Sequence, residues 1–362
     1  MDFQTLLDNI QELSDLELGV LLSLIAQGHC LMTTDDDLID DLASELSLIV
    51  SERFGLSYVV LGPEGLTSVD QFGEAILEPK GPQFPAEDDT QFASAHARLA
   101  SVDIRAAPGR HDQYDAGLDN RVVKNVIIAK GFNFADPYVQ VQAIELINNR
   151  RMISRTTVHV VPKQFLFIPV IAASTKHIRL LPHLNDRIFI SHYHLPEHGF
   201  VNLEELDQSA ASDDHSSPSG FRSSWETSRT ASRSIATIAI DKIRAIGEAC
   251  DITPEVRRYL QDIVTFIRLE RGVEGGITPR ASTDFLALAK YLGPLHSINF
   301  VTPSLVALAA RKIYLHRIVI ADPARERSMQ YGSDSAAVVE LLDGLTPEEV
   351  IENVLATVPC PI

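Results

Sequence analysis

The sequence predicts an α/β domain followed by an all-helical domain, and three features along the chain indicate this fold class. Up to about residue 202, short apolar strands alternate with amphipathic helices, which is typical of a sheet covered by helices. Residues 207–234 contain mainly polar residues, and residues 235–316 show only helical periodicity. We therefore expect a sheet domain over 1–202, a linker over 203–235, a helical domain over 236–320 and a C-terminal tail with a helix over 321–362.

Short apolar runs place the strands of the first domain. The run FLFIPVIAA at 165–173 is apolar throughout, and because a strand buried on both faces has this pattern, we expect it in the centre of a parallel sheet. Residues 151–162 alternate between apolar and polar like a hairpin. The other expected strands cover 29–32, 56–62, 123–129 and 186–194, and the expected helices cover 4–27, 36–54, 138–148 and, within the loop-rich segment 79–120, residues 90–100.

Three Thr-Pro pairs mark helix starts in the second domain. A threonine side chain can accept a hydrogen bond from the first helical turn, and proline fits the first helical position because its missing N–H has no partner there. The pairs begin at Thr253, Thr278 and Thr302. The stretch before this domain, residues 207–234, holds few apolar residues, so it cannot offset its ordering entropy, and we expect it to be disordered.

Composition limits the possible partners. The chain has 362 residues with a net charge of −18, and such an acidic surface repels phosphate backbones, so we expect no nucleic-acid binding. No apolar run reaches bilayer length, so we expect no membrane segment. The three cysteines lie far apart without metal-ligand spacing, which is simplest in a reducing compartment; we expect an intracellular protein, cytoplasmic or nuclear.

Several motifs resemble AAA+ ATPases of the magnesium-chelatase and MoxR branch. AKGFNFADPYVQ at 129–140 is similar to IDEINRADPxVQ, which closes the Walker B strand of that family. PHLNDRI at 182–188 resembles its PqLLDRF motif, and TPRA at 278–281 resembles its SPRA motif. Residues 301–320 resemble VTPEDVKALAPPVLRHRIIL, and the chain is similar to fungal magnesium-chelatase-like proteins. The resemblance implies an AAA+-like parallel sheet domain with flanking helices, followed by a helical lid.

The phosphate-binding loop of that family is missing. A P-loop, G-x-x-x-x-G-K-[ST], needs glycines so that backbone N–H groups can wrap the phosphates, and a lysine that reaches their oxygens. Here TTDDDLIDDLASEL follows the first strand, no glycine lies between Gly28 and Gly55, and the first lysine is Lys80. Carboxylates at a helix start suit the helix dipole and repel an anion. We therefore expect no tight MgATP binding.

The residues at the Walker B and sensor 1 positions also differ from those of the family. The family's Asp and Glu fall on Lys130 and Gly131, which can neither bind Mg²⁺ nor position water. Sensor 1 needs a polar residue at the end of the strand 165–173, where this chain has Ala172 and Ala173, with Ser174 next. Because three separate elements fail together, we expect a degenerate member without intrinsic ATPase activity.

Two arginines of the family's nucleotide machinery are retained. The motif matches place Arg187 at the arginine finger and Arg280 at sensor 2. A finger acts on the nucleotide of a neighbouring subunit, so the resemblance implies that Arg187 could serve an active AAA+ partner or another copy in a homo-oligomer. The alternative is that both arginines form ordinary ion pairs. Since an unpaired buried arginine is unfavourable, we expect Arg187 to be partly exposed at the domain rim.

The segment HYHLPEH offers a weak metal-site candidate. His192 and His194 fall on one face of a strand, with Glu197 and His198 nearby, and two histidines with a carboxylate can hold Zn²⁺. No second ligand set appears elsewhere, so we expect no metal site and keep a histidine-based metal hydrolase only as a minor alternative.

Two functions therefore remain open. The first is a catalytically inactive AAA+-like module that needs no cofactor and acts as an interaction or scaffold subunit of a larger assembly. The second is an active magnesium-chelatase-type ATPase that binds ATP and Mg²⁺ through divergent motifs. The missing P-loop favours the first.

Overall fold

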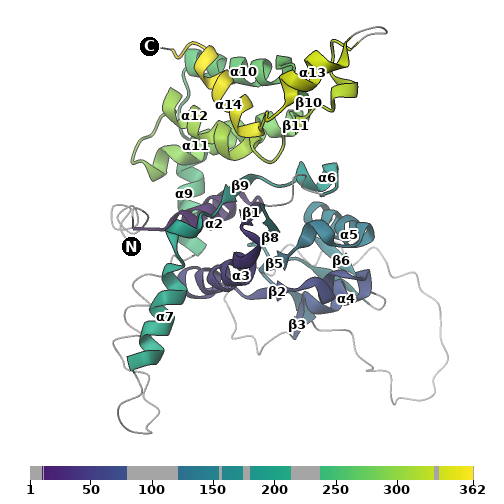
Figure 1. Ribbon diagram of the computed structural model, residues 1–362. Helices are drawn as coiled ribbons and strands as arrows, with labels where there is room; N and C mark the ends of the chain where they lie inside the picture. Colours follow the sequence, from purple (N-terminus) through teal and green to yellow (C-terminus); the bar gives the residue numbers. More distant parts are fainter. Residues whose placement is uncertain are drawn as a thin grey trace, which may run out of the picture.

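A five-stranded parallel sheet forms the base of the protein, and a helical lid lies on one side of it (Figure 1). The computed structural model describes residues 10, 12–79, 121–154, 157–173, 180–212, 237–329 and 334–361. The strand order is β2-β5-β8-β1-β9, and every pairing in this sheet is parallel. The strands are β1 (Cys30–Thr34), β2 (Tyr58–Leu61), β5 (Val126–Lys130), β8 (Leu166–Ala172) and β9 (Ile190–Tyr193).

Helices cover both faces of the sheet. Successive strand residues point to opposite faces, so Ile128 and Ile168 belong to one apolar cluster while Ile127 and Phe167 belong to another. The first cluster includes α2 (Asp15–Ala26) and α3 (Ile39–Leu48), and it continues into the lid; the second includes α4 (Val69–Ala75) and α5 (Pro137–Asn149). The predicted central position of β8 is confirmed, because all seven of its residues are buried.

The structure corrects some predicted boundaries. The strand expected over 123–129 is two elements: β4 (Arg121–Val123) pairs antiparallel with β3 (Leu77–Pro79), and β5 begins at Val126. The helix expected over 36–54 is a 3₁₀ turn, then α3, then a π turn. The hairpin is confirmed as β6 (Arg151–Ile153) and β7 (Val158–Val160). The helix expected over 90–100 lies outside the described residues.

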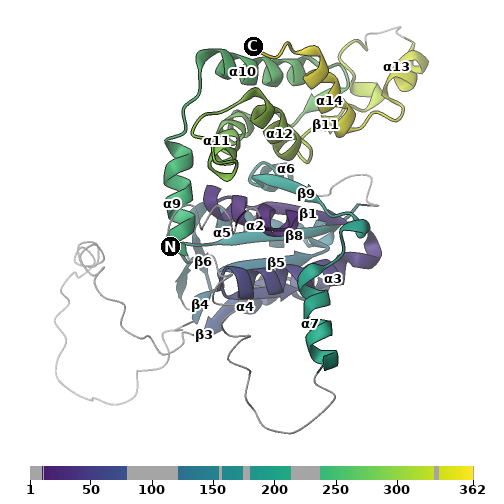
Figure 2. The same cartoon turned by 90° about the vertical axis from the view of Figure 1, so that its left-hand side faces the viewer.

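Capped helices build the lid. The threonine side chains of Thr253, Thr278 and Thr302 each accept a hydrogen bond from the backbone N–H three residues later, as the Thr-Pro pairs predict. The lid helices are α9 (Thr237–Glu248), α10 (Pro254–Leu269), α11 (Pro279–Leu295) and α12 (Pro303–Tyr314). In Figure 2, α11 and α12 lie over α2 and β9, and the contacts between these elements agree. The lid therefore packs directly on the sheet domain.

One feature of the lid differs from the sequence-based expectation. A short antiparallel pair, β10 (Val273–Gly275) and β11 (Val319–Ile320), lies within the otherwise helical lid. Gly276 follows β10 with φ +99°, and a Cβ there would lie 1.7 Å from the Arg317 carbonyl oxygen, so this turn requires glycine. Helical periodicity alone does not reveal strands of two or three residues.

The chain segments on either side of the lid also contain helices. Helix α7 (Val201–Ser212) extends into the stretch expected as a linker from residue 203, and residues 213–236 lie outside the described residues. The buried Glu45 carboxylate accepts hydrogen bonds from the backbone N–H groups of Asn202 and Leu203, which supports the start of this helix. The C-terminal stretch forms α13 (Ser335–Leu342) and α14 (Pro347–Thr357), and α14 packs on α10 and α12. Among the described residues, no helix combines the length and apolarity needed to cross a membrane.

Candidate functional site

The loop after β1, where an ATPase would hold phosphate, is an acidic 3₁₀ turn. Asp35 is extended, and the Leu38 N–H donates to its carbonyl, so the chain turns directly into α3. The Tyr193 hydroxyl lies 3.1 Å from the Asp35 carboxylate. Because Asp36 and Asp37 open the turn, negative side chains occupy the helix start at which an anion would otherwise bind.

Lys130 forms an ion pair with an aspartate of this acidic segment. Its Nζ lies 2.6 Å from Asp40 Oδ1, and the Asp40 side chain is 82% exposed. Such an exposed pair contributes less than about 1 kcal/mol to stability. The placement of the two charges is nevertheless informative. Asp40 follows β1, where the P-loop motif has a lysine, and Lys130 ends β5, where the Walker B motif has an aspartate. Relative to the AAA+ motifs that the sequence resembles, the two charges are thus reversed.

The backbone at Gly131 also differs from what a catalytic glutamate would adopt readily. Gly131 has φ +62°, and its N–H donates to the Val170 carbonyl oxygen at 2.8 Å. This left-handed conformation favours glycine, so a glutamate would be strained there. At the neighbouring strand end, Ala172 is buried and the Ala173 N–H donates to the Thr34 carbonyl, while Ser174 lies outside the described residues. Neither Ala172 nor Ala173 supplies the polar side chain that sensor 1 needs.

The segments that carry Arg187 and Arg280 meet at the end of the sheet where the parallel strands begin, opposite to the end that carries Lys130. We call this end the arginine edge. Arg187 precedes β9, so it lies at the entry of a parallel strand, whereas Lys130 is at the exit of β5. The Thr278 hydroxyl donates to Asp186 Oδ1 at 2.5 Å, which joins the segments that carry the two arginines. Arg187 is half-buried, and its guanidinium forms no ion pair or hydrogen bond with the residues that the structure describes. The structure thus joins the segments that carry Arg187 and Arg280, and it places Arg187 at the opposite strand end from Lys130 and Gly131.

A buried histidine lies near this edge, and the sequence had not marked it as a site residue. His29 Nδ1 accepts a hydrogen bond from the Phe167 N–H at 3.1 Å, which requires a neutral acceptor nitrogen. Burial, with the charges of Arg150, Arg280 and Arg187, lowers the pKa of His29 to about 3. The edge is therefore a cluster of arginines around a neutral imidazole, in a chain whose net charge is −18.

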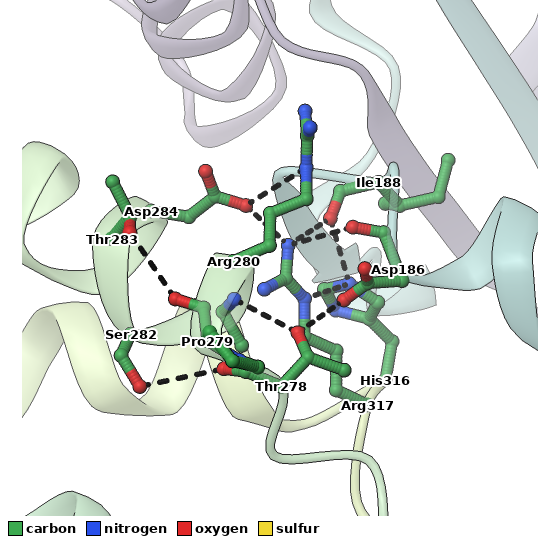
Figure 3. A network of polar contacts seen from close by, with 11 residues as sticks. Asp186, Ile188, Thr278, Pro279, Arg280, Ser282, Thr283, Asp284, His316 and Arg317 are labelled. Atoms are coloured by element: carbon green, nitrogen blue, oxygen red, sulfur yellow. Dashed lines mark hydrogen bonds and ion pairs between the residues drawn. The ribbon is translucent and has the colours of Figure 1, made fainter.

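Arg317 fastens the lid to the sheet domain (Figure 3). Its side chain is 1% exposed, and its Nη2 donates to Asp284 Oδ2 at 2.7 Å and to the Ile188 carbonyl oxygen at 2.5 Å. Asp284 also lies 3.8 Å from the Arg280 Nε. In addition, the Asn185 amide donates to the His316 carbonyl oxygen at 2.7 Å. Sequence reasoning missed Arg317 because only its place in the family-like segment 301–320 distinguished it.

The two histidines of the weak metal-site candidate are buried and not arranged as ligands. His192 and His194 lie on the same side of β9, as expected, with Tyr193 between them at the surface. His192 Nδ1 is 3.1 Å from Lys312 Nζ, and both ring nitrogens of His194 are buried without a hydrogen-bond partner. Within the described ranges, no group of three or more histidine, cysteine, aspartate or glutamate side chains is placed to hold a metal.

The parallel sheet and the helical lid together define an AAA+-like α/β fold. The structure is similar to the crystal structure of a candidate ATPase from Cytophaga hutchinsonii, with a TM-score of 0.61, 14% identity and coverage of 99% of this chain and 97% of that one. At this identity the likeness establishes the fold. No family model matches the chain.

Curated relatives in yeasts share a smaller part of the sequence. A protein named maintenance of telomere capping protein 2 from Vanderwaltozyma polyspora is 31% identical over 104 residues, covering 26% of this chain and 30% of that protein. The protein of the same name from Lachancea thermotolerans is 32% identical over 95 residues, covering 25% of this chain and 33% of that protein. The chain thus spans about a third of the length of the curated relatives it matches.

Proposed function

We propose that this protein is a catalytically inactive AAA+-like module that acts as an interaction subunit of a larger assembly. The observation that carries the proposal is the Lys130–Asp40 pair, which reverses the charges that an ATP site needs at the ends of β1 and β5. The left-handed backbone of Gly131 supports it, because a glutamate would be strained at that position. No cofactor is needed for this function.

The arginine edge is the part of the module that would act on a partner. Arg187 and Arg280 lie at the strand-entry edge, away from the chain's own degenerate site, and a guanidinium presents a fork that matches phosphate oxygens. We propose that this edge faces the nucleotide of a neighbouring AAA+ subunit, so that Arg187 acts in trans. The partner would be an active AAA+ protein or, if nucleotide binds weakly to this chain, a second copy.

The curated relatives suggest where such an assembly acts. Their name refers to telomere capping, so we propose that the assembly serves telomere maintenance in the nucleus. The net charge of −18 makes this chain a protein-binding member of the assembly and leaves contacts with nucleic acid to others. Affinity purification of the tagged protein from its native cells tests this, with recovery of an intact AAA+ subunit as the expected result.

MgATP is expected neither to be hydrolysed by the purified protein nor to raise its melting temperature. A ligand at 100 times its Kd would add about 2.7 kcal/mol of stability, which a thermal-shift assay detects easily. The double variant Lys130→Asp/Gly131→Glu, which restores the Walker B letters, is expected to give no shift either, because the P-loop is still missing. The alternative of a divergent ATPase is favoured by the retained Arg280. An MgATP-dependent rise in the melting temperature that disappears in Arg280→Ala would establish that alternative.

Arg187→Ala is expected to leave the melting temperature within about one degree. A half-buried side chain without an ion-pair or hydrogen-bond partner among the described residues contributes less than about 0.5 kcal/mol. The same change is expected to lower the ATPase rate of a co-purified active partner at least tenfold, because a finger contributes on the order of 10³-fold or more. Arg151→Ala, an exposed change on the hairpin, is the matched control for both measurements. A large loss of stability would instead make Arg187 a structural residue.

A further inference from the structure

A largely apolar cavity lies between the lid and the sheet domain. Its volume is about 580 Å³, within the range of small-molecule sites. Its lining residues come mainly from α2, β9, α11 and α12, the elements that lie together in Figure 2. Most of its wall is aliphatic, including Leu18, Leu22, Leu288, Leu292 and Leu308. An aliphatic ligand would find apolar contacts on both the lid side and the sheet side.

The polar part of the wall consists of a lysine beside a buried histidine. Lys312 Nζ lies 3.1 Å from His192 Nδ1, and both residues line the cavity. Burial and the Lys312 charge lower the pKa of His192 to about 4, so the imidazole is neutral at pH 7. Its Nδ1 therefore accepts from the ammonium group, and its proton is on Nε2.

This arrangement leaves hydrogen-bond donors without acceptors. His192 is 6% exposed, and its Nε2 is buried without a partner. Among the described residues, no carboxylate lies within ion-pair distance of Lys312, although the Asp15 carboxylate also lines the cavity. The Nε2–H of His192 points away from Lys312, because the two ring nitrogens face different sides of the imidazole. An anionic ligand beside Lys312 would therefore accept from the ammonium, two of whose N–H bonds are not used by His192.

We propose that the cavity binds an aliphatic monocarboxylic acid, with its carboxylate at Lys312 and its chain along the leucines. Two N–H bonds of the ammonium are not used by His192, and a carboxylate can accept from them. The Asp15 carboxylate opposes a second negative charge in the cavity, so it limits the affinity. This site is separate from the degenerate nucleotide site and does not depend on the proposed scaffold function.

Titration calorimetry of the full chain with decanoate and with 1-decanol tests the proposal. The two probes share an aliphatic chain and differ in the head group, so we expect decanoate to bind at least tenfold more tightly than decanol. Equal affinities, or no binding of decanoate, would overturn the proposal without any variant. Because neither probe involves nucleotide or an AAA+ partner, failure here leaves the proposed function untouched.

Three variants locate the site. Lys312→Met is expected to weaken decanoate binding at least tenfold and to leave decanol binding unchanged, whereas Asp15→Asn is expected to tighten decanoate binding. Leu308→Trp, which fills the cavity, is expected to abolish the binding of both probes. Lys242→Met, at an exposed position on α9, is the charge-matched control and should bind decanoate like the unmodified chain. Tight decanoate binding by Lys312→Met would contradict the assignment.

Discussion

Replacing Arg317 with alanine is expected to lower the free energy of unfolding by about 3–5 kcal/mol. The substitution leaves Asp284, whose side chain is 17% exposed, without its 2.7 Å partner, and removes a donor to the Ile188 carbonyl oxygen. Breaking a buried ion pair on one side typically has an effect of this size, because the remaining carboxylate then has only the 3.8 Å contact with the more exposed Arg280. Urea denaturation followed by circular dichroism measures the change.

Two further variants separate the charge effect from a general loss of packing. Arg325→Ala removes a guanidinium that is 72% exposed and 3.3 Å from Glu274, so it is expected to change stability by less than about 1 kcal/mol. Arg317→Met combined with Asp284→Leu replaces both charges by apolar groups and is expected to recover most of the loss. If Arg317→Ala were no more destabilising than Arg325→Ala, the buried pair would not hold the lid.

Acidification is expected to destabilise the protein well before its carboxylates titrate. Burial lowers the pKa values of His29 and His316 to about 3 and that of His192 to about 4, while the same side chains in the unfolded chain titrate near 6.5. The unfolded state therefore binds more protons below pH 6.5, so stability falls as pH falls. Each histidine contributes up to about 1.4 kcal/mol per pH unit, or about 4 for the three together.

The pH window follows from these values. The histidine contribution is fully present above pH 6.5, decreases from there downward, and stops changing below about pH 3, where the folded state is protonated as well. Urea midpoints measured from pH 7.5 to pH 5 test the slope. His316→Gln is expected to reduce the slope, and His183→Gln, an exposed change on α6 (Pro182–Asn185), is expected to leave it unchanged. A midpoint constant over this range would contradict the prediction.

The sequence alone determined the features that depend on local pattern. A continuous apolar run identified β8 as central, since only a strand covered on both faces can be apolar throughout. The Thr-Pro pairs identified three helix starts because a cap is formed within one turn of chain. The absence of P-loop glycines and of the Walker B carboxylates could likewise be read directly from neighbouring residues. The expectation of inactivity that rests on them stays a prediction.

Only the tertiary structure decided which distant side chains meet. Lys130 pairs with Asp40, 90 positions away, and Lys312 lies beside His192, 120 positions away. Periodicity indicates which face of an element is buried, but it carries no information on which element covers that face. That choice depends on strand order and on how the lid packs over α2 and β9, both of which arise from many apolar contacts acting together. The reversed charges, the arginine edge and the lid cavity are consequences of that packing.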